Sequence, residues 1–162
     1  MSAQEQNKAI IRRLVEEVYN GDDLDVLEEL LSPDFVNHSA VPVHQHGIEG
    51  FKHVNRWVRA GFSDAHYEIE DMIAEGDRVA CRITLTGTHD GEFQGSPPTG
   101  RRLRMDHVHW HRLAEGKLVE RWAEAVAERG EPGGFGQSAD DFLARNPDLL
   151  RSDLIPRPSS SA

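Results

Sequence analysis

The sequence has little of what marks a secreted or membrane-bound protein. Its 162 residues include one cysteine, Cys81, which excludes an intrachain disulfide framework and makes a reducing cytoplasm the expected location. No apolar run approaches the length of a membrane span, and the first residues lack the charged, apolar and cleavage segments of a signal peptide. We therefore expect a cytoplasmic protein without a membrane partner. Because Cys81 lies in the apolar run RVACRITL, its thiol is predicted to be buried and unreactive.

Basic residues are also scarce. The chain has 18 lysine and arginine residues against 28 aspartate and glutamate residues, which gives a formal net charge of −10. This excess of negative charge argues against non-specific binding to nucleic acid or to anionic lipid, because those partners are themselves negative. A length of 162 residues suits one domain with a hydrophobic core.

The first half of the chain has apolar residues at helical spacing. This spacing predicts a helix over residues 2–20, which begins with the capping-box pattern SAQE, and a third helix over 48–60. Between them, the leucines of 22–32 predict a short second helix that ends at Ser32-Pro33. The stretch 34–47 has no clear period and is predicted to be an extended segment and loop.

The second half reads as strands. Residues 66–88 form two extended runs around the turn EGD, and residues 101–128 repeat the pattern around EG, so two hairpins are predicted. The segment DGEFQGSPPTG between them is expected to form a turn at the rim of the sheet. These elements predict an α+β fold in which three helices pack against a four-stranded antiparallel meander and leave a ligand cavity between the layers.

The combination of AEGDRVACRITLTGTHDGEFQGSPPTGRRLRM with HRLAEGKLVERW closely resembles the SnoaL-like polyketide cyclases. They belong to the superfamily of nuclear transport factor and ketosteroid isomerase, and FVNHS and GIEGFKH support the match. The resemblance implies a cone-shaped α+β barrel over residues 1–128, with the helices packed in a curved, mostly antiparallel sheet. It also implies a homodimer and an apolar pocket without cofactor, in which acid–base chemistry closes a polyketide ring by intramolecular aldol addition. Residues 129–162 are predicted to be a Gly/Pro-rich extension with a short helix at 138–145 and a disordered end.

The resemblance also indicates where the site lies. The family's acid/base is an aspartate directly after the tryptophan of GKxVExW, but this chain has Ala123 there, so its reaction is open to divergence. Arg121 shares the strand side that the family directs into the pocket. His109 and His38 match two further pocket positions.

The stretch RLRMDHVHWHR places His107, His109 and His111 on one face of a strand. The unperturbed pKa of histidine, about 6.5, suits acid–base catalysis near neutral pH. We therefore predict His109 as general base or acid, with His38 or Arg121 stabilising the developing anion. The predicted substrate-binding residues are Asn37, His107, Trp57 and Ala123.

Each of these residues also has a structural interpretation. His109 fits equally a hydrogen-bonded pocket histidine, and His107 and His111 fit positions at the rim of the barrel. Arg121 fits an ion pair with Glu68, Glu70 or another strand carboxylate.

A metal site is the other alternative for the histidines. Pairs at i and i+2, including His44 and His46, can bind zinc together, but a third ligand would have to come from a distant segment. The family implied by the resemblance binds no metal, so neither metal nor cofactor is predicted.

Two functions are therefore left open. The first is a cofactor-independent cyclase-like enzyme that acts on a small, apolar or aromatic, carbonyl-bearing molecule. The second is a non-catalytic protein that binds such a molecule on the same scaffold. Ala123 favours the binding protein, whereas the polar set of His38, His109 and Arg121 favours the enzyme, because burying unpaired polar groups would not benefit an apolar carrier.

Overall fold

The computed structural model describes residues 1–40 and 44–130, the last five of them by their backbone alone. The predicted helix at 138–145 and the predicted disordered end lie outside these residues. In the two described ranges, no helix is both long enough and apolar enough to cross a membrane. Cys81 is buried as predicted, and burial raises the pKa of its thiol to about 12.

The first predicted helix consists of two parts. Helix α1 (Ala3–Arg13) begins at Ser2, whose hydroxyl accepts a hydrogen bond from the Glu5 amide at 3.2 Å. It continues directly into a π-helix, η1 (Leu14–Asn20), whose wider turn changes the direction of its last side chains. The short helices η2 (Leu24–Val26) and α2 (Leu27–Leu30) follow.

The sheet has one strand more than predicted. Its order is β1-β5-β4-β3-β2, and β1 runs parallel to β5 while the other neighbours are antiparallel. The strands are β1 (Leu31–Asn37), β2 (His66–Glu75), β3 (Arg78–Thr88), β4 (Arg102–Ala114) and β5 (Lys117–Gly130). The α+β class with a mostly antiparallel sheet is confirmed, but β1 corrects the four-stranded meander.

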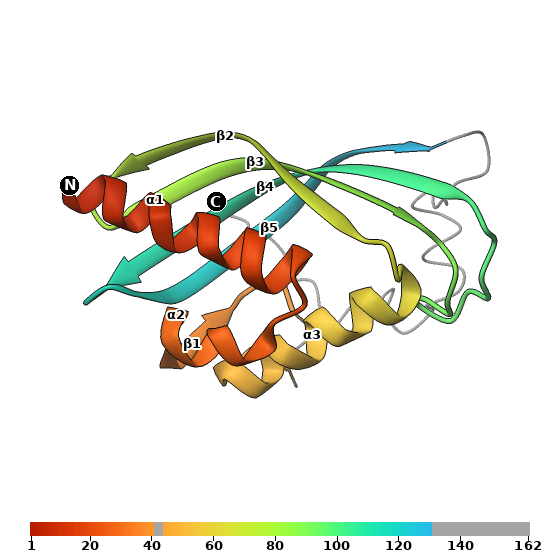
Figure 1. The fold of residues 1–162 in the computed structure, drawn as a ribbon, viewed down its shortest axis with the longest axis horizontal. Helices are drawn as coiled ribbons and strands as arrows, with labels where there is room; N and C mark the ends of the chain where they lie inside the picture. The colour runs from red at the N-terminus through yellow and green to blue at the C-terminus, as the bar shows by residue number, and fades with distance from the viewer. Residues whose placement is uncertain (41–43, 131–162) are drawn as a thin grey trace, which may run out of the picture.

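The sheet is curved but does not close into the cone-shaped barrel that we expected. Strands β1 and β2 lie at opposite edges and do not pair with each other. Helix α1 and helix α3 (Gly47–Gly61) lie on the same, concave side of the sheet, as Figure 1 shows. The helices therefore fill the space that a closed sheet would enclose.

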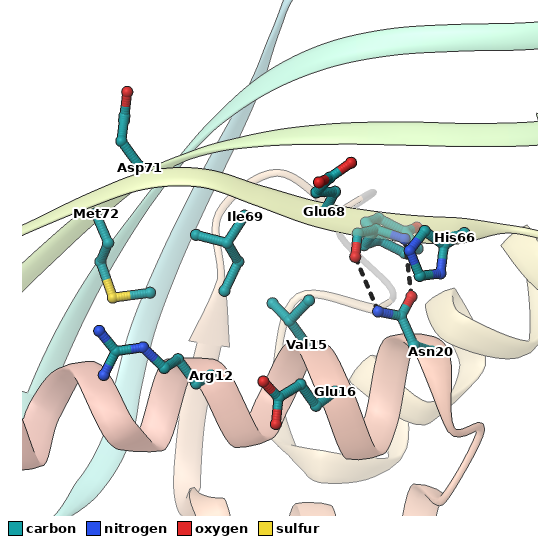
Figure 2. Close-up of a pocket in the computed structure, with 10 residues that line it drawn as sticks. Arg12, Val15, Glu16, Asn20, His66, Glu68, Ile69, Asp71 and Met72 are labelled. Atoms are coloured by element: carbon teal, nitrogen blue, oxygen red, sulfur yellow. Dashed lines mark hydrogen bonds between the residues drawn. The ribbon is translucent and has the colours of Figure 1, made fainter.

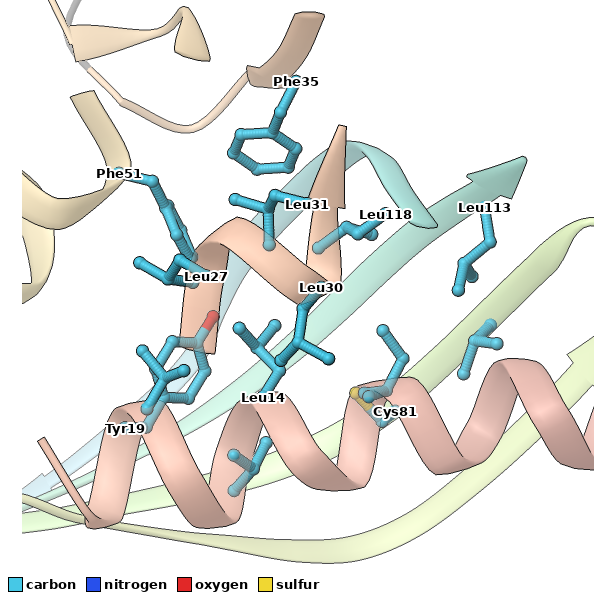
Figure 3. Packing of buried hydrophobic residues seen from close by; sticks show 14 of the residues in the cluster. Leu14, Tyr19, Leu27, Leu30, Leu31, Phe35, Phe51, Cys81, Leu113 and Leu118 are labelled. Atoms are coloured by element: carbon cyan, nitrogen blue, oxygen red, sulfur yellow. The ribbon is translucent and has the colours of Figure 1, made fainter. Parts of the chain in front are cut away.

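The main core lies between these helices and the sheet. Leu14 from η1, Leu27 and Leu30 from α2, and Leu113 and Leu118 from the sheet pack together, and each is at most 3% exposed (Figure 3). Complete burial stabilises the fold by about 1.5–3 kcal/mol for each such side chain. This cluster fixes the positions of η1 and of the first residues of β5 on the concave side of the sheet.

Strand β5 contains a bulge at Val119. Leu113 of β4 pairs with Leu118, whereas Arg112 pairs with Glu120, so Val119 is an extra residue without a partner. Leu118 is buried in the core, and without the bulge Glu120 and Trp122 would share its face. The extra residue shifts the alternation by one, so Arg121 and Ala123 point toward the helices instead.

Candidate active site

A cavity of about 350 Å³ lies between α3, the π-helix and the concave face of the sheet. This is within the range of ligand sites in proteins. Most of its wall is apolar and comes from α3 and from strands β3 and β5, including Phe51, Val54, Val58, Leu85 and Ala125. Its polar side chains include Tyr19, His107 and Arg121.

Arg121 carries a positive charge that no described carboxylate neutralises. Its Nη1 donates to the Asn37 side-chain oxygen at 3.1 Å, and its guanidinium lies 5.5 Å from the centre of the Phe51 ring. Its Nε is buried without a hydrogen-bond partner among the described residues. The alternative ion pair with Glu68 or Glu70 does not form. A guanidinium with an unused donor in an apolar cavity is suited to bind negative charge on a ligand.

The three histidines of β4 form a row that leads from the cavity into the core. His107 lines the cavity, whereas His109 and His111 are both 0% exposed. The Nδ1 atom of His107 is 3.4 Å from Nε2 of His109, and the rings of His109 and His111 are 5.9 Å apart. The predicted shared face is confirmed, but the three histidines lie at different depths. It is His107, and not His109, that reaches the cavity.

Burial determines the charge of these histidines. Burial lowers the pKa of His107 and lowers that of His109 far below its ordinary value, and the nearby charge of Arg121 lowers both further. The same two causes lower the pKa of His111 to about 3. All three rings are therefore neutral at pH 7, while Arg121 stays charged.

Tyr19 is a cavity residue that the sequence analysis missed. The π-helix turns it into the cavity, where its ring lies 4.8 Å from Tyr67 and edge-on to His109 at 6.4 Å. Its hydroxyl is buried near Arg121 and makes no hydrogen bond of ordinary geometry in the described part of the chain; burial raises its pKa, so it remains a donor. In the sequence, Tyr19 only continues the apolar stripe of the first helix, which is typical of a core residue.

The remaining predicted residues divide between the two faces of the sheet. Asn37 is 1% exposed and supports Arg121, and Ala123 lines the cavity. His38, by contrast, bonds Glu120 through Nε2 at 2.9 Å and stacks on Trp122 at 4.4 Å, and it is not among the residues that line the cavity. The predicted role of His38 stays a prediction that this geometry does not support.

Trp57 lies beside the cavity and not in its wall. The residue is 40% exposed, and its ring stacks at 4.4 Å on Phe93, which does line the cavity. Phe93 comes from the glycine-rich segment after β3, where Gly91 lies against the end of α3. A Cβ at Gly91 would be 1.8 Å from the Ala60 carbonyl oxygen, so only glycine allows this approach.

No three potential metal ligands gather within residues 1–40 and 44–130. His44 stacks on His53 at 3.8 Å, and His46 precedes the first residue of α3. The absence of a metal remains a prediction.

A second hollow of about 550 Å³ lies between the α1–η1 helix and strand β2 (Figure 2). Arg12, Glu16, Glu68 and Asp71 contribute charged groups of both signs. The Asn20 side chain crosses the hollow at one end and bonds the backbone of Tyr67 twice, at 2.8 Å each. This hollow contains none of the predicted site residues, so the first cavity is the candidate active site.

Comparison with known proteins gives a consistent result. The model of the family described as SnoaL-like polyketide cyclase matches residues 9–125. Over 131 residues the chain is 31% identical to an aklanonic acid methyl ester cyclase of Streptomyces peucetius, covering 76% of this chain and 90% of that protein. It is 34% identical over 105 residues to the nogalonic acid methyl ester cyclase of Streptomyces nogalater, covering 62% of this chain and 76% of that one.

Solved structures agree with these sequence relatives. A protein of Jannaschia sp. CCS1 assigned to the SnoaL-like polyketide cyclases superposes with a TM-score of 0.70 at 31% identity. The match covers 78% of this chain and 90% of that one. The resemblance predicted from the sequence motifs is confirmed.

Proposed function

Because the chain belongs to the SnoaL-like polyketide cyclase family, we propose that it is a cofactor-independent cyclase that closes a ring in an apolar, carbonyl-bearing, polyketide-like molecule. One observation carries this proposal. A neutral histidine, His107, and an unneutralised guanidinium, Arg121, meet in the wall of an otherwise largely apolar cavity. A base and an anion-stabilising group are the two components that an aldol addition needs.

The reaction follows from these groups. The neutral ring of His107 takes a proton from the carbon next to a substrate carbonyl, and the resulting enolate oxygen is stabilised by Arg121 and by the Tyr19 hydroxyl. The enolate carbon then bonds to a second carbonyl carbon of the same molecule. The new alkoxide takes back the proton from His107, so the product is an isomer of the substrate and no co-reactant is used.

This mechanism does not use the aspartate that the family has at the position of Ala123. Ala123 lies in the cavity wall and pairs across the strands with His109, so it leaves room for substrate beside the histidine row. His107 then takes the role of acid and base, with Asn37 holding Arg121 in position. The predicted role of His38 is not part of this proposal, because its side chain contacts Glu120 and Trp122 instead.

The proposal is tested with the methyl esters of aklanonic and nogalonic acid, after which two relatives are named. We expect the protein to convert at least one of them to a cyclised isomer, which chromatography separates although its mass is unchanged. His107→Ala should lower kcat about 10²- to 10⁴-fold, because the variant loses its acid–base group. His66→Ala is the matched control, since His66 is an exposed histidine outside the cavity.

The second candidate is the non-catalytic binding protein, which Ala123 favours. Tight binding of both esters without conversion from pH 5 to 9 would support the carrier and contradict the cyclase.

The substitution Ala123→Asp separates the two functions further. A carboxylate at this position would lie in the cavity wall with Arg121 and partly neutralise it. The pKa of His107 should then rise, moving the acid limb of the kcat/KM profile to higher pH, while the unsubstituted protein already turns over the substrate. Cyclisation that appears only in the Ala123→Asp variant would show that the natural protein is not an aldol cyclase.

A further inference from the structure

We propose that His109 is a positioning residue that sets the tautomer of His107, so that His107 presents the lone pair of Nε2, and not an N–H, to the cavity. The inference about the tautomer stands on the contacts of His109 alone. Its catalytic meaning rests on the function proposed above.

The first step is the protonation state of His109. The side chain is 0% exposed and lies beside the Arg121 guanidinium. Burial and this positive charge both oppose a second proton on the ring. His109 is therefore a neutral imidazole, which has one N–H donor and one lone-pair nitrogen.

The contact with Arg121 determines which nitrogen of His109 has the lone pair. Arg121 Nη2 lies 3.5 Å from His109 Nε2. A guanidinium has only donors, so Nε2 must be the acceptor and the ring proton of His109 is on Nδ1. The opposite tautomer would direct two N–H groups at each other. Nδ1 of His109 has no partner among the described residues in either case, so it does not favour one tautomer.

The tautomer of His109 in turn determines the tautomer of His107. Its Nδ1 lies 3.4 Å from the same Nε2 of His109. Since that atom has no proton, the proton between the two rings must be on Nδ1 of His107. A neutral His107 then has its lone pair on Nε2. The two contacts of 3.4 and 3.5 Å share one lone pair, which accounts for both being longer than an ordinary hydrogen bond.

As a consequence, His107 already has the lone pair of a base on Nε2 before the substrate binds. The tautomer of a histidine is set by the hydrogen bond that its other nitrogen makes, and here that bond is buried beneath the cavity wall. Arg121 thus has two effects, since it stabilises negative charge on the ligand and fixes the histidine row through His109. His109 touches no substrate, and for this reason we call it a positioning residue.

The direct test is ¹⁵N NMR of the histidine rings in the intact protein at neutral pH without substrate. We expect Nδ1–H with an unprotonated Nε2 for both His107 and His109. The signals are assigned by their loss in His107→Gln and His109→Gln. A proton on Nε2 of His107 in the unsubstituted protein would overturn the inference.

Two variants of His109 add a kinetic test. The carbonyl of His109→Gln can accept from both Arg121 and His107, so this variant should keep the Nδ1–H tautomer and most of the activity. His109→Leu removes the acceptor, and His107 should shift toward the Nε2–H tautomer, with kcat falling about 10- to 100-fold and KM little changed. An equal loss of kcat in both variants, or an unchanged tautomer in His109→Leu, would contradict the positioning role.

The two proposals fail in different ways. The expected NMR pattern in a protein that converts no substrate would leave the tautomer inference standing and contradict the cyclase. Full turnover by a protein whose His107 has its proton on Nε2 would contradict the tautomer inference and leave the cyclase proposal standing. The tautomers are read from the unsubstituted protein, and the two glutamine variants serve only to assign its signals.

Discussion

Replacing Arg121 by methionine is expected to lower kcat for cyclisation about 10²- to 10³-fold, which is the usual effect of removing one donor to a developing oxyanion. Methionine keeps the apolar stem beside Phe51 but removes the one charged group that we assign to the enolate. The fold should tolerate the change, because no described carboxylate loses a partner. The Asn37 oxygen keeps the Ser39 amide as a donor, and Nε2 of His109 keeps its contact with His107. Steady-state kinetics and thermal unfolding of the same preparation separate the two effects.

The pH profile gives this variant a second readout. The charge of Arg121 is the second-largest cause of the lowered His107 pKa, after burial. Without it the pKa of His107 rises, so the rate supported by neutral His107 should begin to fall at a higher pH than in the unsubstituted protein. Arg82→Met is the matched control, since Arg82 pairs with Asp71 on an exposed part of the sheet. Undiminished kcat in Arg121→Met would contradict the assignment of Arg121.

A fall in pH is expected to destabilise the fold strongly at pH values that are still above those at which carboxylates titrate. His109 and His111 have lower pKa values in the folded chain than the value of about 6.5 in an unfolded one. Stability is therefore complete above pH 6.5 and falls below it, toward about pH 3 for His111. Between pH 7 and 5 His111 alone should cost about 2 kcal/mol, and His109 adds to this loss. Because folded domains are stable by about 5–15 kcal/mol, urea unfolding at pH 7 and pH 5 will detect this loss.

His111→Leu isolates one of these groups. Both ring nitrogens of His111 are buried, and neither makes a hydrogen bond of ordinary geometry in the described residues, so leucine should stabilise the fold at pH 7 by about 1–3 kcal/mol. It should also remove the part of the loss between pH 7 and 5 that His111 causes, about 2 kcal/mol. His53→Leu, at a more exposed histidine, serves as the control. An unchanged dependence of stability on pH in His111→Leu would refute the assignment of this loss to buried histidines.

The sequence predicted the features that depend on local pattern. Alternation along 102–112 correctly placed His107, His109 and His111 on one face, and the turns of both hairpins were found at their glycines. Alternation says nothing about depth, however, so it could not tell that His107 alone of the three reaches the cavity. That order depends on how far η1 and α3 extend along the sheet, which is a property of the packed structure.

Two elements, strand β1 and the π-helix, were not predicted, and each omission has a specific reason. Strand β1 follows directly on α2, and the polar residues and proline in it hid its pairing with β5, which is parallel and distant in sequence. The π-helix was missed because periodicity analysis assumes an ordinary helical turn, and the wider turn changes where Tyr19 points. His38 directly follows Asn37, the last residue of β1, and the contacts of its side chain with Glu120 and Trp122 depend on the pairing of β1 with β5.

The bulge at Val119 has a consequence for how this pocket tolerates a change in chain length. With Val119 lost, Arg121 would lie two residues after Leu118, so the ordinary alternation of a regular strand would keep both side chains on the inner face. The arginine-bearing set of β5 side chains would still meet the ligand, and the charge of the inner surface would not change. Relatives that are one residue shorter at this point are therefore expected to keep the same pocket residues.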